Sequence, residues 1–181
     1  MLSDLEAETG SDNALPVIEQ LRRHHPGEAD AILATLRFRQ GRFEDAAAAL
    51  EAAFADFRAS PWALNRFKER GVALASAVAV RRPDLAARMF DGLKSPFAIR
   101  ALEDERLATE ANLTRLLDFK RQCHGAVAAL EPHVPWSRSF LTLRLDCYRA
   151  VGDPRLGTAI RDLEDFEARE PVALGGPGTA R

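Results

Sequence analysis

Apolar side chains recur every three or four residues through most of the chain, which is the spacing that places them on one face of an α-helix. No run of alternating β-branched and polar residues, bounded by turn residues, predicts a strand. The abundance of alanine, leucine and arginine also favours helix. The pattern therefore predicts an all-α protein.

Prolines divide this helical pattern at regular intervals. They are Pro26, Pro61, Pro96, Pro135 and Pro171, and successive ones are 35 to 39 residues apart. Three of them belong to similar tetrads, at Ser60–Ala63, Ser95–Ala98 and Val134–Ser137. Serine is a good helix cap and proline suits the first helical turn. We therefore expect a helix to begin at each tetrad, the one at Pro61 running to about Val80, with its aromatic residue packed back on the preceding hairpin.

A second break falls between successive prolines and is followed by a small residue on a new helix. It is clearest at Gly41–Ala46 and recurs at Arg81–Ala86, at Gly152–Gly157 and, in a weaker form, at Arg121–Ala126. Glycine permits the left-handed turn that ends a helix, and a small residue lets the next helix approach closely. Each unit is therefore predicted to fold as helix–turn–helix.

A helix–turn–helix unit of about 34 residues with a closing proline resembles the tetratricopeptide repeat. The best match is the stretch 28–61, with Leu33 and Ala34 on the first helix, Gly41 and Phe43 at the turn, and Ala46, Leu50 and Ala53 on the second helix. The resemblance implies a short right-handed α-solenoid of roughly four to five stacked hairpins. We expect it to span residues 1–171, with the glycine-rich residues 172–181 as a disordered tail.

The beginning of the chain fits only part of a repeat. Ala14, Ile18 and Leu21 suit the second helix of a unit whose first helix would be short, from Leu2 to Glu8. A polar cap is the usual end of a repeat array. A shortened hairpin in its place predicts that further repeats, or another domain, precede this stretch.

A weaker resemblance concerns the last third of the chain. Its residues are Glu131–Trp136, Tyr148–Ala150, Gly152–Pro154 and Arg161–Leu163 with Phe166. They are similar to the repeat tails of bacterial fused membrane spermidine-synthase-like proteins. The glycine-rich and acidic nucleotide-binding segments of an aminopropyltransferase are absent from the sequence. This resemblance implies that the chain is an accessory or regulatory part of such an enzyme.

Charge and composition narrow the range of partners. The net charge of −2 and the pI of about 6.1 give no electrostatic reason to expect nucleic acid or an anionic membrane surface as a partner. No apolar run approaches the roughly 20 residues of a membrane helix, and the first ten residues lack the features of a secretion signal. We therefore expect a cytoplasmic protein. Cys123 and Cys147 lie in apolar helical patterns and are expected to be buried free thiols.

Candidate catalytic residues are few. Cys123 and His124 are neighbours on a predicted helix and point about 100° apart, so they cannot pair as nucleophile and base. The other histidines have no spacing typical of a zinc site. The charged run Glu103–Arg106 with Arg100 is expected to form a solvated helix face with local ion pairs. The sequence thus predicts no catalytic residues, no metal and no cofactor.

The tetratricopeptide resemblance implies a binding groove lined by the first helix of each unit. The positions carried over from the family are Thr35, Phe38, Arg39, Lys68, Arg115, Asp118, Asp146 and Arg149. One subclass grips a peptide's terminal carboxylate with paired asparagines and lysines, but Thr35, Ala75, Arg115 and Asp146 stand where a groove asparagine would be. A mixed-charge groove with one aromatic suits a short peptide, a protein partner or a neighbouring domain. The predicted function is a protein–protein interaction or scaffold module, and the alternative is the accessory domain of a spermidine-synthase-like enzyme.

Overall fold

The computed structural model describes residues 6–169, except for the Pro132 side chain. After a helical stretch over residues 6–8, its α-helices are α2 (Leu15–Arg22), α3 (Pro26–Arg39), α4 (Phe43–Ala59), α5 (Asn65–Arg81), α6 (Ala86–Leu93), α7 (Glu103–Leu113), α8 (Phe119–Ala128), α9 (Arg138–Val151) and α10 (Leu156–Arg169). Short 3-10 turns are η1 (Asp12–Ala14), η2 (Pro83–Leu85), η3 (Arg100–Leu102), η4 (Thr114–Leu116) and η5 (Glu131–His133). No strand occurs within residues 6–169, so the predicted all-α class is confirmed for them. The expected tail, and the start of the expected first helix, lie outside the described residues.

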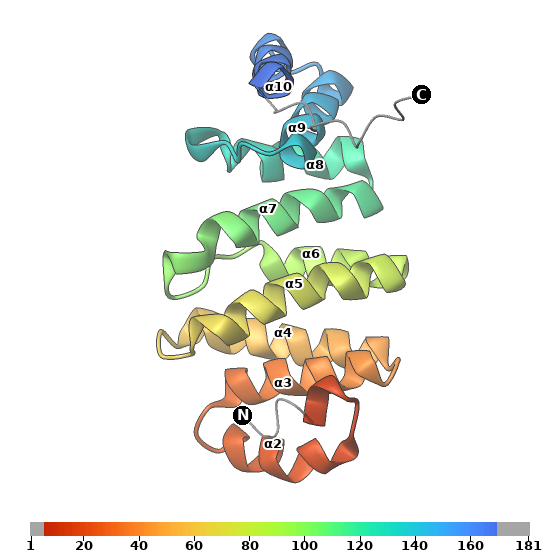
Figure 1. The fold of residues 1–181 in the computed structure, drawn as a ribbon, viewed down its shortest axis with the longest axis vertical. Helices are drawn as coiled ribbons and strands as arrows, with labels where there is room; N and C mark the ends of the chain where they lie inside the picture. Colours follow the sequence, from red (N-terminus) through yellow and green to blue (C-terminus); the bar gives the residue numbers. More distant parts are fainter. Residues whose placement is uncertain (1–5, 170–181) are drawn as a thin grey trace, which may run out of the picture.

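The helices follow one another along the long axis of the molecule in chain order (Figure 1). Short turns join antiparallel neighbours, as between α3 and α4. Each helix packs on the next one in the chain, and α3, α4, α5 and α7 also contact the helix after that: α3 contacts α5, and α5 contacts α7. The core is therefore shared between consecutive helices along the whole stack.

Two of the predicted glycine breaks have the expected geometry. Gly41, between α3 and α4, has a φ of 74°, and Gly152, between α9 and α10, has a φ of 71°. In this left-handed region a side chain is disfavoured. The break after Arg81 is also confirmed, since α5 ends there and η2 begins at Pro83.

The break predicted at Arg121–Ala126 is wrong. These residues lie inside α8, and the chain turns instead at η4, before α8 begins. The Thr114 hydroxyl donates a hydrogen bond to the carbonyl of Ala111 at 2.6 Å, and Leu117 is extended. Asp118 then occupies the N-cap position of α8, where aspartate is common. The third unit is thus divided earlier than the glycine suggests.

The first two proline tetrads follow the ends of helices α4 and α6 and do not begin new ones directly. Ser60 is the C-terminal cap of α4, and its amide donates to the carbonyl of Asp56 at 2.7 Å. Pro61 has no amide with which to extend that pattern, and α5 begins only at Asn65. In the third tetrad Ser137 is the N-terminal cap of α9 and accepts a hydrogen bond from the amide of Phe140, so a helix does begin there as predicted.

The tetrad aromatics differ in where they pack. Phe97 is buried as predicted, with its ring centroid 5.7 Å from those of Phe54 and Phe57 on α4. Trp62 was expected to pack in the same way, but 84% of it is exposed. Trp136 contacts Phe166 of α10, which follows it in the chain. Of the three, Phe97 therefore packs back on an earlier hairpin, and it reaches α4 of the α3–α4 hairpin, past α5 and α6 in the chain.

The residues predicted to lie at the contact between α3 and α4 are buried, and the two helices pack on each other. Ala34, Ala46, Leu50 and Ala53 are all fully buried. The short side chains allow the two helices to approach closely, as expected for the best-matching unit.

The expectation of free thiols is wrong, because Cys123 of α8 and Cys147 of α9 form a disulfide. Both residues are fully buried, as predicted, and their Cα atoms are 5.8 Å apart. This separation is within the usual range for a disulfide. The pairing arises from the way α8 and α9 face each other.

The charged run at the start of α7 is also not a fully solvated face. Arg106 is only 2% exposed and its guanidinium contacts the Glu103 and Glu110 carboxylates and the carbonyl of Leu93. A buried arginine that donates to several acceptors holds together the segments that carry them. It joins α7 to the end of α6.

Candidate binding groove between helices α3 and α5

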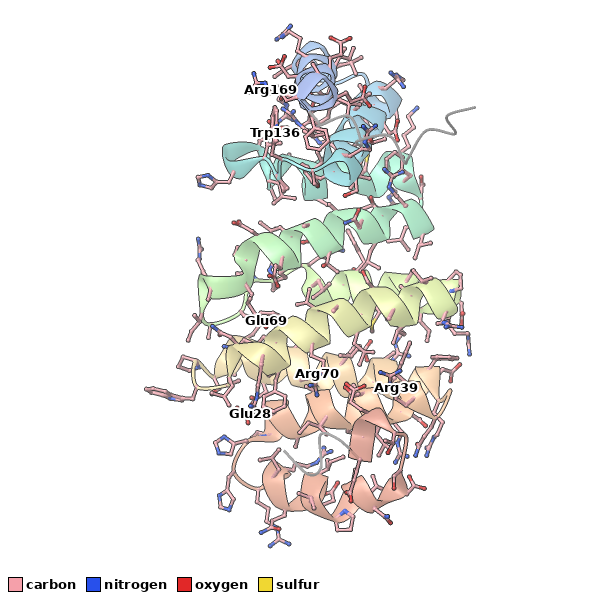
Figure 2. All side chains as sticks on the ribbon, in the orientation of Figure 1. Glu28, Arg39, Glu69, Arg70, Trp136 and Arg169 are labelled. Carbon is pink, nitrogen blue, oxygen red and sulfur yellow. A yellow bond between two sulfur atoms is a disulfide. The ribbon has the colours of Figure 1, made fainter. Side chains whose placement is uncertain are left out.

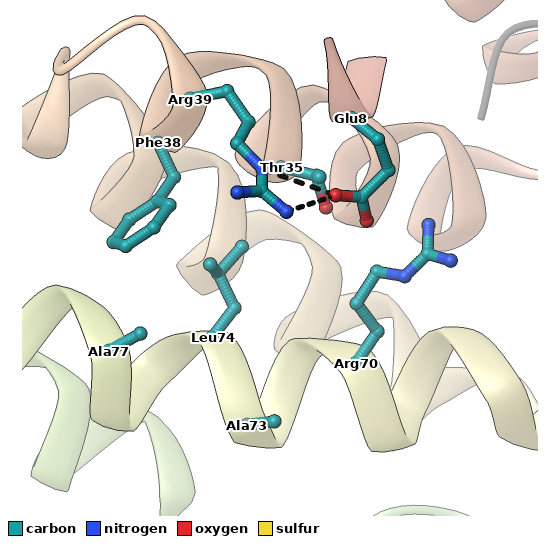
Figure 3. Close-up of a pocket in the computed structure, with 8 residues that line it drawn as sticks. All are labelled: Glu8, Thr35, Phe38, Arg39, Arg70, Ala73, Leu74 and Ala77. Atoms are coloured by element: carbon teal, nitrogen blue, oxygen red, sulfur yellow. Dashed lines mark hydrogen bonds and ion pairs between the residues drawn. The ribbon is translucent and has the colours of Figure 1, made fainter. Parts of the chain in front are cut away.

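An open groove of about 240 Å³ lies between α3 and α5 (Figure 3). Its lining residues are Thr35, Phe38 and Arg39 from α3, Arg70, Ala73, Leu74 and Ala77 from α5, and Glu8 from the segment before α2. We call it the α3–α5 groove. It has an apolar floor and charged groups at its rim.

The α3 side combines a satisfied hydroxyl, an aromatic ring and a cation. The Thr35 hydroxyl donates to the carbonyl of Ala31 at 3.1 Å, within its own helix. Phe38 is half-buried, and its ring meets Phe43 edge-on at 5.5 Å between centroids. The Arg39 side chain is 52% exposed. Phe38 and Arg39 are thus open to contact from outside.

The α5 side of the groove is formed by residues along one face of that helix. Arg70, Ala73, Leu74 and Ala77 have the spacing that aligns side chains along a helix. Ala73 and Ala77 leave room, while Leu74 projects into the space between the helices (Figure 3). Figure 2 shows Arg70 and Arg39 on the same side of the stack.

Glu8 extends into the groove and pairs with Arg39. Its Oε2 atom accepts hydrogen bonds from Arg39 Nη2 at 2.5 Å and Nε at 3.1 Å. The backbone that carries Glu8 is attached separately, since Gln40 Nε2 donates to the Gly10 carbonyl at 3.1 Å and to Asp12 Oδ1 at 2.8 Å. Ala7 is fully buried. The carboxylate is therefore presented to Arg39 by a segment held in place at other points.

Of the predicted groove residues, the structure brings Thr35, Phe38 and Arg39 together. Lys68 is not among the lining residues, because it lies two positions before Arg70 and points about 200° away around the helix. It is fully buried, and its Nζ has no hydrogen-bond partner among the described residues. Burial lowers the pKa of Lys68, while the nearby Glu28 carboxylate partly opposes this shift.

The other predicted residues lie elsewhere. Arg115 is in η4 and Asp118 is the N-cap of α8. The tetratricopeptide resemblance had placed both residues within the first helix of the third unit, and neither lies in such a helix. Arg115 Nη1 approaches Asp146 Oδ2 of α9 at 3.7 Å. Arg149 is exposed in the last turn of α9. None of these four lines the α3–α5 groove.

The sequence-based prediction missed Glu8 and the whole α5 side. The spacing of Arg70, Ala73, Leu74 and Ala77 was a usable signal, because it marks one helix face with two small residues. Glu8 had no such signal, since its position depends on how the first segment packs on α3.

A second polar cluster joins α8 to the turn before α10. His124 Nε2 lies 2.9 Å from Asp153 Oδ2, and Arg155 also contacts both oxygens of Asp153. The Arg155 guanidinium, with smaller help from His124, holds the pKa of Asp153 far below its usual range. Because Cys123 is in a disulfide, no thiol adjoins this histidine. Within residues 6–169 no three histidine, cysteine or acidic residues are grouped as metal ligands.

Comparisons of the chain with protein-family models, curated proteins and solved structures found no match. Within the described residues no helix is long and apolar enough to cross a membrane. Fold and site together define an all-α protein of sequentially packed helices with an open groove between two of them.

Proposed function

We propose that the protein is an interaction module of tetratricopeptide-like repeats that binds a protein or peptide segment in the α3–α5 groove. The sequential packing of the helices supports a solenoid, which we take to be right-handed as in the family that the sequence resembles. The hairpin of α3 and α4 supports the repeat, with Gly41 at its turn and alanines at its contact.

The composition of the groove is the observation that carries this proposal. Phe38 and Leu74 offer apolar contact, and Arg39 offers directed hydrogen bonds. Aromatic and arginine side chains are enriched among the residues that dominate binding energy at protein interfaces. An open groove of about 240 Å³ is smaller than the roughly 300–1,000 Å³ of typical small-molecule sites. It suits the side chains of a peptide.

Blocking the groove tests the proposal. Ala73 is exposed on α5, so Ala73→Trp fills the groove without disturbing the core. Ala87→Trp on α6 is the matched control, because Ala87 is also exposed but does not line the groove. Proteins captured from the source cells would be quantified for wild type and both variants. We expect partners that are lost only with Ala73→Trp, and an unchanged set of partners would reject the groove.

Arg39→Ala is a milder test of the same site. Arg39 is half exposed, so its truncation should reduce partner capture and leave the melting temperature unchanged. Phe38 is less suitable on its own, because it also packs on Phe43.

The second candidate is the accessory domain of a spermidine-synthase-like enzyme. One observation bears on it: two of the residues behind that resemblance are in contact, since the Tyr148 hydroxyl donates to Glu131. Glu131 also accepts hydrogen bonds from Arg144 at 2.8 and 3.1 Å. Residues that carry this resemblance therefore help to hold α9 against the turn that contains Glu131. Repeated failure to co-purify an aminopropyltransferase with the chain would count against this candidate.

A cytoplasmic location remains part of the proposal, and the Cys123–Cys147 disulfide makes it testable. Disulfides persist in oxidising compartments and are rare in the reducing cytoplasm. Alkylation of protein taken directly from its source cells measures the two thiols. A reduced pair supports the cytoplasm, whereas an oxidised pair opposes it.

A further inference from the structure

Glu8 contacts Arg39 in the way that the carboxylate of a bound ligand would. A carboxylate oxygen accepts two hydrogen bonds from one guanidinium, beside an apolar floor formed by Leu74 and two alanines (Figure 3). Charge-assisted hydrogen bonds of this kind are stronger than neutral ones. The site thus has a built-in preference for a carboxylate at this position.

This contact is also readily exchanged. The Arg39 and Glu8 side chains are 52% and 37% exposed, and exposed ion pairs contribute little to stability. Both hydrogen bonds go to the same carboxylate oxygen, Oε2. An incoming carboxylate can therefore replace Glu8 without unfolding the segment, which Ala7 and Gln40 hold independently.

We infer that the α3–α5 groove recognises an acidic peptide with an adjacent apolar side chain, and that Glu8 competes with it for Arg39. This inference rests on the proposed function. The peptide carboxylate takes the place of Glu8 on Arg39, and its apolar side chain packs against Leu74 and Phe38. Glu8 lowers the affinity of the resting protein, because a ligand must displace it first.

Peptide selection on the intact chain tests the ligand class. A phage-displayed library of random dodecapeptides serves as the probe. We expect selected sequences to be enriched in aspartate or glutamate next to leucine, isoleucine or phenylalanine. Selection on Ala73→Trp should yield no such enrichment. Enrichment of neutral or basic peptides on the wild-type chain would overturn the inference.

Affinities of the best selected peptide, measured by fluorescence anisotropy, test the competition. Glu8→Gln keeps the shape of the side chain and removes its charge, so binding should tighten about two- to fivefold. Arg39→Gln should weaken it about tenfold or more, since a hydrogen bond to a charged group is lost. Asp45→Asn is the control: it removes another exposed arginine–carboxylate pair, with Arg42, outside the groove, and should change nothing.

The possible failures can be told apart. Peptides that bind in the groove and are blocked by Ala73→Trp, yet ignore Glu8→Gln and Arg39→Gln, would refute the competition and leave the proposed function standing. Selected peptides that bind Ala73→Trp as well as wild type would reject the groove itself. Equal tightening by Glu8→Gln and Asp45→Asn would show a general charge effect and also refute the competition.

Discussion

Lys68 places an ammonium group in the interior of the helical stack. It is fully buried, and its Nζ makes no hydrogen bond to the described residues. An uncompensated buried polar group costs about 1–3 kcal/mol. We therefore expect Lys68→Met, which keeps the length of the side chain, to raise the free energy of unfolding by up to about that amount, less the attraction to Lys68 that the Glu28 carboxylate loses. Urea denaturation at pH 7 measures it, and Lys120→Met, at an exposed position of α8, should have little effect.

The same substitution predicts a pH dependence. Burial lowers the pKa of Lys68 from its ordinary value of 10.5. Between the lowered value and 10.5 the unfolded chain binds more protons than the folded chain, so stability rises with pH. The advantage of Lys68→Met over wild type should therefore shrink as the pH is raised toward 10.5 and remain constant below the lowered pKa. Paired denaturation curves from neutral to alkaline pH measure this difference, and a constant gap throughout would contradict it.

The position of a single residue could be predicted only where a turn signal in the sequence showed which face of its helix the residue occupies. Thr35, Phe38 and Arg39 lie together in the α3–α5 groove, and their shared helix face could be inferred because Gly41, with its positive φ, marks the end of α3. The turn after α5 contains Arg82 and a 3-10 turn instead of a glycine, so the phase of Lys68 was not fixed in the same way. Glu8 could not be predicted, because it reaches the groove through tertiary packing alone.

At the scale of helices, the Cys123–Cys147 disulfide joins α8 to α9. Cross-linking two cysteines 24 residues apart restricts the unfolded chain and contributes about 3 kcal/mol to stability. Reduction should lower the free energy of unfolding by roughly that amount. Denaturation with and without reductant measures it. A variant with both cysteines changed to alanine is the control, because its stability should not respond to reductant.

Phe97 tests the link between the first hairpin and the helices that follow. It is 5% exposed and packs on Phe54 and Phe57, while the amide of Ala98 donates to the carbonyl of Phe57 at 2.9 Å. Phe97→Ala should cost about 3–5 kcal/mol. Ile99→Ala, at a residue that is 40% exposed, should change stability by less than about 1 kcal/mol. Similar melting temperatures for the two variants would show that Phe97 does not join the units.

The existence of the helices was predictable, but their boundaries and pairings were only partly so. The hairpin around Gly41 followed from local turn chemistry. The start of α5 did not, because Pro61 ends α4 and leaves a turn before Asn65. The turn at η4 contains neither glycine nor proline, so no local signal marked it. The disulfide depends on which faces of α8 and α9 meet, and this is decided by packing.

Across the whole molecule, sequential packing implies unequal local stability. In α4 seven residues are buried and the helix contacts α3, α5 and α6. In α10, at one end of the stack, only Ala159 is buried (Figure 1). In such arrays the terminal elements open most readily. Hydrogen exchange followed by mass spectrometry should show much faster exchange in α10 than in α4, and equal protection would indicate a single cooperative unit.

The disulfide between α8 and α9 also governs how the chain responds to tension. Each unfolded residue adds at most about 3.3–3.6 Å to the length of a stretched chain. The disulfide closes a loop whose ends are 24 residues apart, so on the order of 80 Å of chain length cannot be extended while the bond is intact. A load applied to the two ends of the molecule would thus unfold and fully extend the helices around Gly41. The segment between the two cysteines would remain short until the disulfide is reduced.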